Sequence, residues 1–122
     1  MGALDPERDM TFVEDTASGF ILAALADGVA GEVINLGTGQ TASVGILSKR
    51  ILSLMNSSKP IVQEESRMRP KLSEVMRLVS DNSKAKRLLG WEPRTKLDDG
   101  LLETISFVKQ NEHIYRPSTY TV

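Results

Sequence analysis

Apolar positions recur along the chain at two spacings, one typical of helices and one typical of strands. Four segments have apolar residues three and four positions apart, which predicts helices over residues 14–27, 44–55, 82–89 and 98–112. Four short apolar runs predict strands over residues 10–13, 32–36, 60–63 and 75–80. Residues 64–74 and the tail from Tyr115 lack either spacing, so we expect irregular structure there.

Residues suited to helix ends support this assignment. Ser43 and Asp81 precede predicted helices and are good N-caps. Gly90 follows a predicted helix where a left-handed C-terminal cap is favoured, and Pro93 prevents the helix from continuing. Short strands alternating with helices predict an α/β fold, with a small sheet of about four short strands and about four helices. The chain is long enough to bury one core, so we expect a single domain over residues 1–122.

Composition excludes several classes of protein. The 122 residues include no Cys and one His, which excludes a disulfide framework and a multi-histidine zinc site. No basic segment followed by an apolar stretch begins the chain, and no run of about 18 apolar residues occurs. We therefore expect a cytoplasmic protein that is not inserted in a membrane.

Charge is distributed unevenly along the chain. Residues 1–42 carry seven acidic residues and one basic residue, Arg8, whereas the basic residues are densest between Arg67 and Arg94. This excess favours an anionic partner, although such residues are more often the solvated faces of helices. A net charge of −1 and few aromatic residues argue against nucleic acid as the partner.

A glycine-containing loop suggests one specific chemistry. Residues Gly37 to Ala42 have the spacing G-x-G-x-x-A between a predicted strand and a predicted helix, as in dinucleotide-binding loops. In such loops the pyrophosphate lies against backbone amides at a helix N-terminus. The alternative is a simple turn in which glycine supplies positive φ angles. The sequence has no Tyr-x-x-x-Lys pair, G-x-S-x-G motif or Walker loop, so no catalytic residue is predicted.

Several segments together resemble one family, the extended short-chain dehydrogenases/reductases that act on nucleotide sugars. The matching motifs are R-D-x-x-x-V-x-D, N-x-G-x-G followed by S-V, R-P, and D-x-S-K-A-x-x-x-L-G-W-x-P followed by L-x-x-G-L. In this chain they occupy residues 8–15, 35–44, 69–70, 81–93 and 97–101. Their order and spacing fit across nearly the whole chain, and Ser73-Glu74-Val75 favours the nucleotide-sugar 4,6-dehydratases within the family.

The resemblance implies that this chain corresponds to the C-terminal, substrate-binding lobe of that fold. The N-terminal Rossmann half, which in the family holds NAD and the catalytic Tyr-x-x-x-Lys pair, has no counterpart in the sequence. The loop Gly37–Ala42, called the glycine loop below, then corresponds to a turn that lies far downstream of the cofactor loop in the sequence. We therefore expect NAD to bind only when the missing Rossmann half is present. We expect no catalysis by this chain alone.

The resemblance also implies three substrate-binding residues. Arg8 and Arg69 correspond to the two arginines that contact the nucleotide diphosphate. Ser43 corresponds to a polar residue at a helix start near the nucleotide, and the alternative is that Ser43 is only a helix cap. Asn35 is interpreted as a turn residue and Trp91 as a core residue. Leu72 replaces a polar base-contacting residue of some relatives, so the base is not predicted.

The predicted function is therefore binding of a nucleotide-diphosphate sugar, with low affinity, by part of an NAD-dependent dehydratase or epimerase. Two alternatives stay open, a protein-interaction fragment without a small ligand and a self-contained dinucleotide binder that uses Gly37–Ala42. The expected protein partner is a second copy or a complementary Rossmann-half chain. A homodimer is expected because the missing half would leave Phe20, Ile21 and Leu25 uncovered beside the predicted 32–36 strand.

Overall fold

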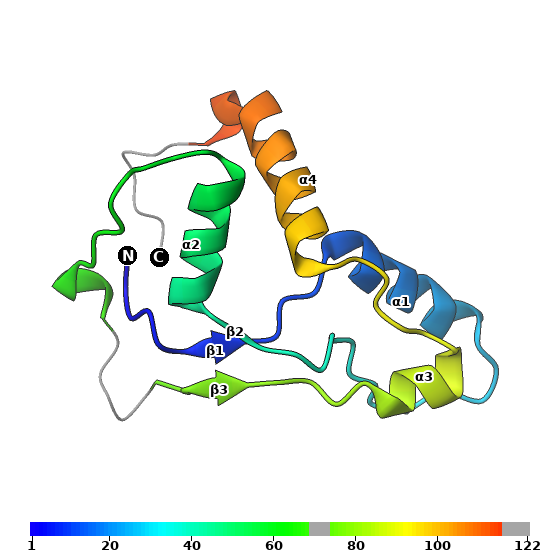
Figure 1. Ribbon diagram of the computed structural model, residues 1–122. Coiled ribbons are helices and arrows are strands. Elements are labelled where there is room, and N and C mark those ends of the chain that lie inside the picture. Colours follow the sequence, from blue (N-terminus) through cyan, green and yellow to red (C-terminus); the bar gives the residue numbers. More distant parts are fainter. Residues whose placement is uncertain (69–73, 116–122) are drawn as a thin grey trace.

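The computed structural model describes residues 1–68 and 74–115 and contains four α-helices within those ranges (Figure 1). They are α1 (Val13–Leu25), α2 (Val44–Leu54), α3 (Ser83–Leu89) and α4 (Leu97–Gln110). Two short 3-10 helices lie at Glu65–Arg67 and Glu112–Ile114. All four predicted helices are therefore confirmed, and Gly90 adopts the left-handed conformation predicted for the cap of α3.

Three two-residue strands form the sheet in the described part of the chain, in the order β2-β1-β3. They are β1 (Glu7–Arg8), β2 (Ala42–Ser43) and β3 (Arg77–Leu78). The central strand β1 runs antiparallel to β2, with Glu7 opposite Ser43, and parallel to β3, with Glu7 opposite Arg77. The sheet thus aligns three segments far apart in the sequence.

The strand predictions were mostly wrong. Of the four segments predicted as strands, only residues 75–80 contain one, β3. Residues 10–13 lead from β1 into α1, which begins at Val13. Residues 32–36 are not assigned to a strand because they have no ladder partner among the described residues. Residues 60–63 are hydrogen-bonded to the start of the chain, where the Met1 amine donates to the Val62 carbonyl over 2.6 Å, but they form no regular ladder with the described residues. The α/β class is correct, with a smaller sheet than predicted.

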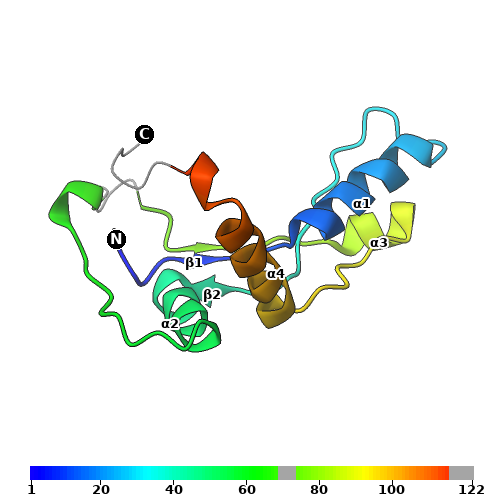
Figure 2. The same ribbon diagram turned by 90° about the horizontal axis from the view of Figure 1, so that it is seen from above.

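The helices lie in two groups. In Figures 1 and 2, α1 and α3 lie together at one end of the molecule, while α2 and α4 lie on one side of the sheet. The exposed ion pair between Arg50 Nη1 on α2 and Asp98 Oδ1 on α4, 2.8 Å apart, joins the second group. No helix in the described ranges combines the length and the apolar character needed to cross a bilayer.

The core of the described structure is small and centres on Trp91. Trp91 is 1% exposed, and its Nε1 donates to the Asp15 carbonyl over 2.9 Å and to Ser18 Oγ over 3.1 Å. The buried Asp15 carboxylate in turn accepts from the Thr95 amide over 2.9 Å. These bonds fix α1 to the segment between α3 and α4, so the interpretation of Trp91 as a core residue is confirmed.

Candidate functional site

Arg8, a predicted diphosphate ligand, lies on the central strand of the sheet. Its Nη1 donates to the carbonyl oxygens of Glu7 and Val75 over 2.8 and 2.7 Å, and its Nη2 donates to Glu74 Oε1 over 2.9 Å. The side chains of Arg8 and Glu74 are 25% and 14% exposed, so the ion pair is largely withdrawn from solvent. The guanidinium is therefore held in one orientation by three acceptors.

Arg8 lines an open cavity of about 380 Å³ beside the parallel strands. Its polar lining residues are Arg8, Asp9, Thr11, Asn35 and Ser80. A volume in this range is adequate for part of a nucleotide, since whole small-molecule sites occupy about 300–1,000 Å³. This Arg8 cavity is the candidate substrate site.

Asp9 organises the wall of the Arg8 cavity. Its Oδ1 accepts from the amide and the hydroxyl of Thr38, over 2.9 and 2.5 Å, and its Oδ2 accepts from the amides of Gly39 and Ser80, over 2.9 and 3.2 Å. Partial burial opposes ionisation of the carboxyl group, but the hydrogen bonds from Thr38, Ser80 and Gly39 outweigh it and lower the pKa of Asp9. Asp9 is thus an ionised anchor that joins β1 to the glycine loop and to the end of β3.

The glycine loop packs too closely against Ser80, two residues beyond β3, to carry a side chain at Gly37. A Cβ at Gly37 would lie 2.3 Å from the Ser80 Cβ and 2.9 Å from Asp9 Oδ2. Asn82 Nδ2 donates to the Gly37 carbonyl over 2.7 Å and closes the loop from the other side. The turn-stabilising role assigned to Asn35 therefore belongs to Asn82, whereas Asn35 is exposed and lines the Arg8 cavity.

Ser43 lies at the start of α2, as predicted, and the structure shows its capping role. Its Oγ accepts a hydrogen bond from the Ile46 amide over 3.1 Å, which satisfies one of the free amides at the helix N-terminus. Ser43 does not line the Arg8 cavity. The predicted ligand Arg69 and the base-contacting position Leu72 lie outside the described residues.

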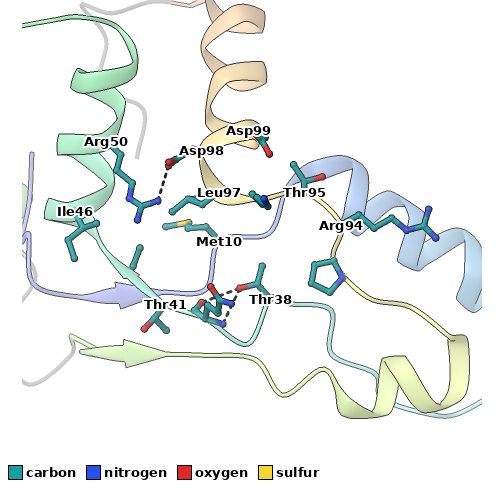
Figure 3. Close-up of a pocket in the computed structure, with 14 residues that line it drawn as sticks. Met10, Thr38, Thr41, Ile46, Arg50, Arg94, Thr95, Leu97, Asp98 and Asp99 are labelled. Carbon is teal, nitrogen blue, oxygen red and sulfur yellow. Dashed lines mark hydrogen bonds and ion pairs between the residues drawn. The ribbon is translucent and has the colours of Figure 1, made fainter.

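A larger cavity of about 680 Å³ lies between α2, α4 and the segment from Thr38 to Ala42 (Figure 3). Arg50 and Asp98 pair across it, and Arg94 extends away from it in Figure 3. Neither Arg8 nor Ser43, the two predicted substrate ligands within the described residues, lines this cavity. The described residues also contain no cluster of three or more His, Cys, Asp or Glu able to hold a metal ion.

Comparison with known proteins identifies the family to which this chain belongs. The family model described as GDP-mannose 4,6 dehydratase matches residues 1–104. The chain therefore belongs to this family of NAD-dependent nucleotide-sugar epimerases and dehydratases, within the extended short-chain dehydrogenases/reductases. The family resemblance drawn from the motifs is confirmed.

Individual relatives support the same assignment. The chain is 30% identical over 102 residues to a UDP-glucose 4-epimerase of Mycolicibacterium smegmatis, which covers 84% of this chain and 31% of the relative. It is 34% identical over 113 residues to UDP-glucuronic acid decarboxylase 1 of Xenopus tropicalis, covering 92% of this chain and 25% of the relative. The chain thus spans about a quarter to a third of the length of the curated relatives that it matches.

Solved structures reproduce the fold. The epimerase Mth375 of Methanothermobacter thermautotrophicus matches with a TM-score of 0.84 and 31% identity, over 97% of this chain and 34% of that chain. The UDP-glucose 4-epimerase of Thermotoga maritima, solved with UDP-glucose, matches with a TM-score of 0.79 and 29% identity, over 92% of this chain and 34% of that chain. The arrangement described here thus corresponds to about one third of a longer fold.

Proposed function

We propose that this chain is the nucleotide-sugar-binding portion of an NAD-dependent sugar-nucleotide 4,6-dehydratase or epimerase and is not catalytic alone. The observation that carries the proposal is the fixed guanidinium of Arg8 at the edge of the Arg8 cavity. The family membership and the UDP-glucose bound to the Thermotoga maritima relative support a nucleotide sugar as the ligand.

The hydrogen bonds of Arg8 leave donors for a phosphate. A guanidinium has five N–H donors, and Arg8 uses both Nη1 hydrogens and one Nη2 hydrogen on Glu7, Val75 and Glu74. The Nε hydrogen and the second Nη2 hydrogen have no partner within residues 1–68 and 74–115. Two donors of one guanidinium suit two phosphate oxygens, so Arg8 is the proposed diphosphate contact.

Arg69 is proposed as the second diphosphate contact. It precedes Glu74 by five residues in the sequence, and Glu74 pairs with Arg8. A diphosphate with two arginine contacts would gain charge-assisted hydrogen bonds from both. The Glu74 carboxylate offsets part of the Arg8 charge, which is why low affinity is proposed. We assign Ser43 to capping of α2 and leave it out of this contact set.

The residues of the glycine loop do not fit NAD. A dinucleotide-binding loop needs free backbone amides for the pyrophosphate, but the Thr38 and Gly39 amides donate to the Asp9 carboxylate. That carboxylate would also repel a pyrophosphate placed at the same amides. The proposal therefore includes no cofactor site at Gly37–Ala42. Under the proposal, NAD binds only when further polypeptide supplies a Rossmann half.

Catalysis under this proposal requires further polypeptide. The relatives are about three to four times as long as the part that this chain matches, so the chain corresponds to about a quarter to a third of each of them. The proposed partner for catalysis is a complementary Rossmann-half chain that supplies NAD and the reacting groups. A protein-interaction fragment without a small ligand is the second candidate, because Glu74 already neutralises Arg8, the one arginine that lines the Arg8 cavity among the described residues.

Calorimetric titration of the chain with UDP-glucose and GDP-mannose, and with glucose and mannose as controls, tests the proposal. We expect saturable heat with at least one nucleotide sugar, none with the free sugars, and no turnover. Absence of binding to any nucleotide-diphosphate sugar at millimolar concentration would favour the interaction fragment. Turnover by the purified chain would contradict the non-catalytic assignment.

A further inference from the structure

We propose that Asp27, in the pair Asp27-Gly28, is a site of spontaneous succinimide formation, through which the aspartate converts to isoaspartate. This modification is independent of nucleotide binding and goes beyond the proposed function. Its reacting atoms belong to two consecutive residues, so no second chain is required. The basis for the site is a contrast between the two Asp-Gly pairs of the sequence, Asp27-Gly28 and Asp99-Gly100.

Isoaspartate formation at an Asp-Gly pair is intramolecular. The backbone nitrogen of the glycine attacks Cγ of the aspartate, and one carboxyl oxygen leaves as water with the amide proton and the carboxyl proton. The product is a five-membered succinimide ring. Addition of water at the main-chain carbonyl carbon leaves the chain joined through Cβ and Cγ, which is isoaspartate, whereas addition at Cγ restores aspartate. The water that was lost is regained, so no oxidant or reductant is needed.

The reaction requires a glycine nitrogen that can approach Cγ of the preceding residue. Glycine favours this approach, because no Cβ stands beside the attacking nitrogen and its backbone has wide conformational freedom. An amide that is hydrogen-bonded within a helix must first break that bond by local opening of the helix, since the peptide unit has to rotate and the nitrogen has to lose its proton. The state of the glycine amide therefore decides which Asp-Gly pair reacts.

The amide of Gly28 meets this requirement. α1 ends at Leu25, and Asp27 and Gly28 lie in the exposed turn after it, in the connection that runs along the edge of the molecule in Figure 1. Within residues 1–68 and 74–115, neither the Gly28 amide nor the Asp27 carboxylate has a hydrogen bond or an ion pair. Gly28 has a φ of +73°, and a Cβ at this position would have no atom outside the turn within 4 Å. No described residue therefore restrains this peptide unit.

The amide of Gly100 does not meet the requirement. Gly100 lies near the start of α4, where its amide donates to the Lys96 carbonyl over 3.0 Å. Gly100 is buried, and a Cβ there would lie 3.0 Å from Cδ2 of Phe12, so the peptide unit has little room to rotate. Asp99 is exposed, as is Asp27. The two pairs thus differ in the glycine amide and not in the access of water to the carboxyl group.

Incubation of the 122-residue chain at neutral pH for several weeks, followed by peptide mapping, tests this assignment. An isoaspartyl methyltransferase with labelled S-adenosylmethionine quantifies isoaspartate in each peptide. We expect isoaspartate to accumulate at Asp27 at least about tenfold faster than at Asp99, because the helix must open locally before the Gly100 amide can react. In urea that unfolds the chain, the two pairs should react at similar rates, since the difference arises from the fold.

Asp27→Asn and Asp99→Asn are a matched pair of variants, with circular dichroism as the check that each is folded. Asparagine forms the same ring with loss of ammonia, and hydrolysis of the ring then gives a heavier chain, because a hydroxyl group replaces the NH₂ group. We expect folded Asp27→Asn to gain this mass and folded Asp99→Asn to gain it far more slowly. Absence of isoaspartate at Asp27 in the folded chain while the unfolded chain reacts would overturn the inference. Equal rates at Asp27 and Asp99 in the folded chain, or a preference for Asp27 that persists in urea, would also overturn it.

Discussion

The Asp9 carboxylate accepts two hydrogen bonds from Thr38, one from its amide and one from its hydroxyl, over 2.9 and 2.5 Å. Thr38 lies in the glycine loop, 29 residues beyond Asp9, so this contact ties β1 to that loop. The same carboxylate also reaches the Ser80 amide beyond β3. One ionised side chain next to Arg8 therefore fixes three segments of the cavity wall.

Replacement of Asp9 by Asn should destabilise the fold and remove part of its acid sensitivity. The amide nitrogen of Asn would face a backbone donor, and lost charge-assisted bonds cost about 1–3 kcal/mol at pH 7. The pKa of Asp9 is lowered in the folded state, so its stabilisation is present above the unfolded-state pKa of about 3.9 and declines as pH falls through the folded-state pKa. Urea unfolding between about pH 7 and 2.5 measures both effects.

Asp5→Asn is the matched control for this prediction. Asp5 is exposed and has no hydrogen bond to its side chain within the described residues. Its variant should therefore match the wild-type chain at pH 7. An Asp9→Asn variant as stable as Asp5→Asn, with an unchanged loss of stability at low pH, would refute the anchoring role.

Trp91→Phe should destabilise the packing of α1 against the α3–α4 connection. The substitution removes the Nε1 donor of the buried Asp15 carbonyl and of Ser18 Oγ and leaves a small cavity. We expect a loss of about 2–4 kcal/mol in the free energy of unfolding, measured by circular dichroism. Ser18→Ala removes the bond from Trp91 to Oγ and the bond that Oγ donates to the Asp15 carbonyl over 2.7 Å, but it keeps the bond from Trp91 to that carbonyl and should cost less. Equal stability of Trp91→Phe and the wild-type chain would contradict the importance of this core.

The purified chain should not bind NAD. The Thr38 and Gly39 amides, which a dinucleotide-binding loop would offer to pyrophosphate, donate to Asp9. Calorimetric titration with NAD up to about 1 mM should give no saturable heat. Saturable micromolar binding that Gly39→Val abolishes would instead establish the glycine loop as a cofactor site.

The helices could be predicted from the sequence, whereas most of the strands could not. Helix signals are local, since the spacing of apolar residues and caps such as Ser43 and Gly90 lie within the element itself. The strands β1, β2 and β3 contain two residues each, too few to show alternation, and they depend on partners 34 to 70 residues away. The apolar run 32–36 has the composition of a strand but no partner to pair with.

The candidate site was only partly predictable. The family motif identified Arg8, but nothing local indicated that Glu74, 66 residues later, would pair with it. Asp9 directly follows Arg8, so the Arg-Asp pair in the sequence was the available signal for Asp9. The four hydrogen bonds that its carboxylate accepts depend on tertiary contacts and could not be predicted. The family resemblance led us to expect that Phe20, Ile21 and Leu25 of α1 would be uncovered, and they are exposed, whereas periodicity alone predicts a buried face.

The most direct test of the central claim compares nucleotide-sugar binding by Arg8→Ala with binding by Arg87→Ala, an exposed arginine on α3 outside the Arg8 cavity. Calorimetry with UDP-glucose or GDP-mannose should show affinity reduced about ten- to a hundredfold in Arg8→Ala, because one charge-assisted contact contributes about 1.5–3 kcal/mol. Arg87→Ala should bind like the wild-type chain, and adding Arg69→Ala to Arg8→Ala should weaken binding further. Unchanged affinity in a folded Arg8→Ala, Arg69→Ala double variant would contradict the account.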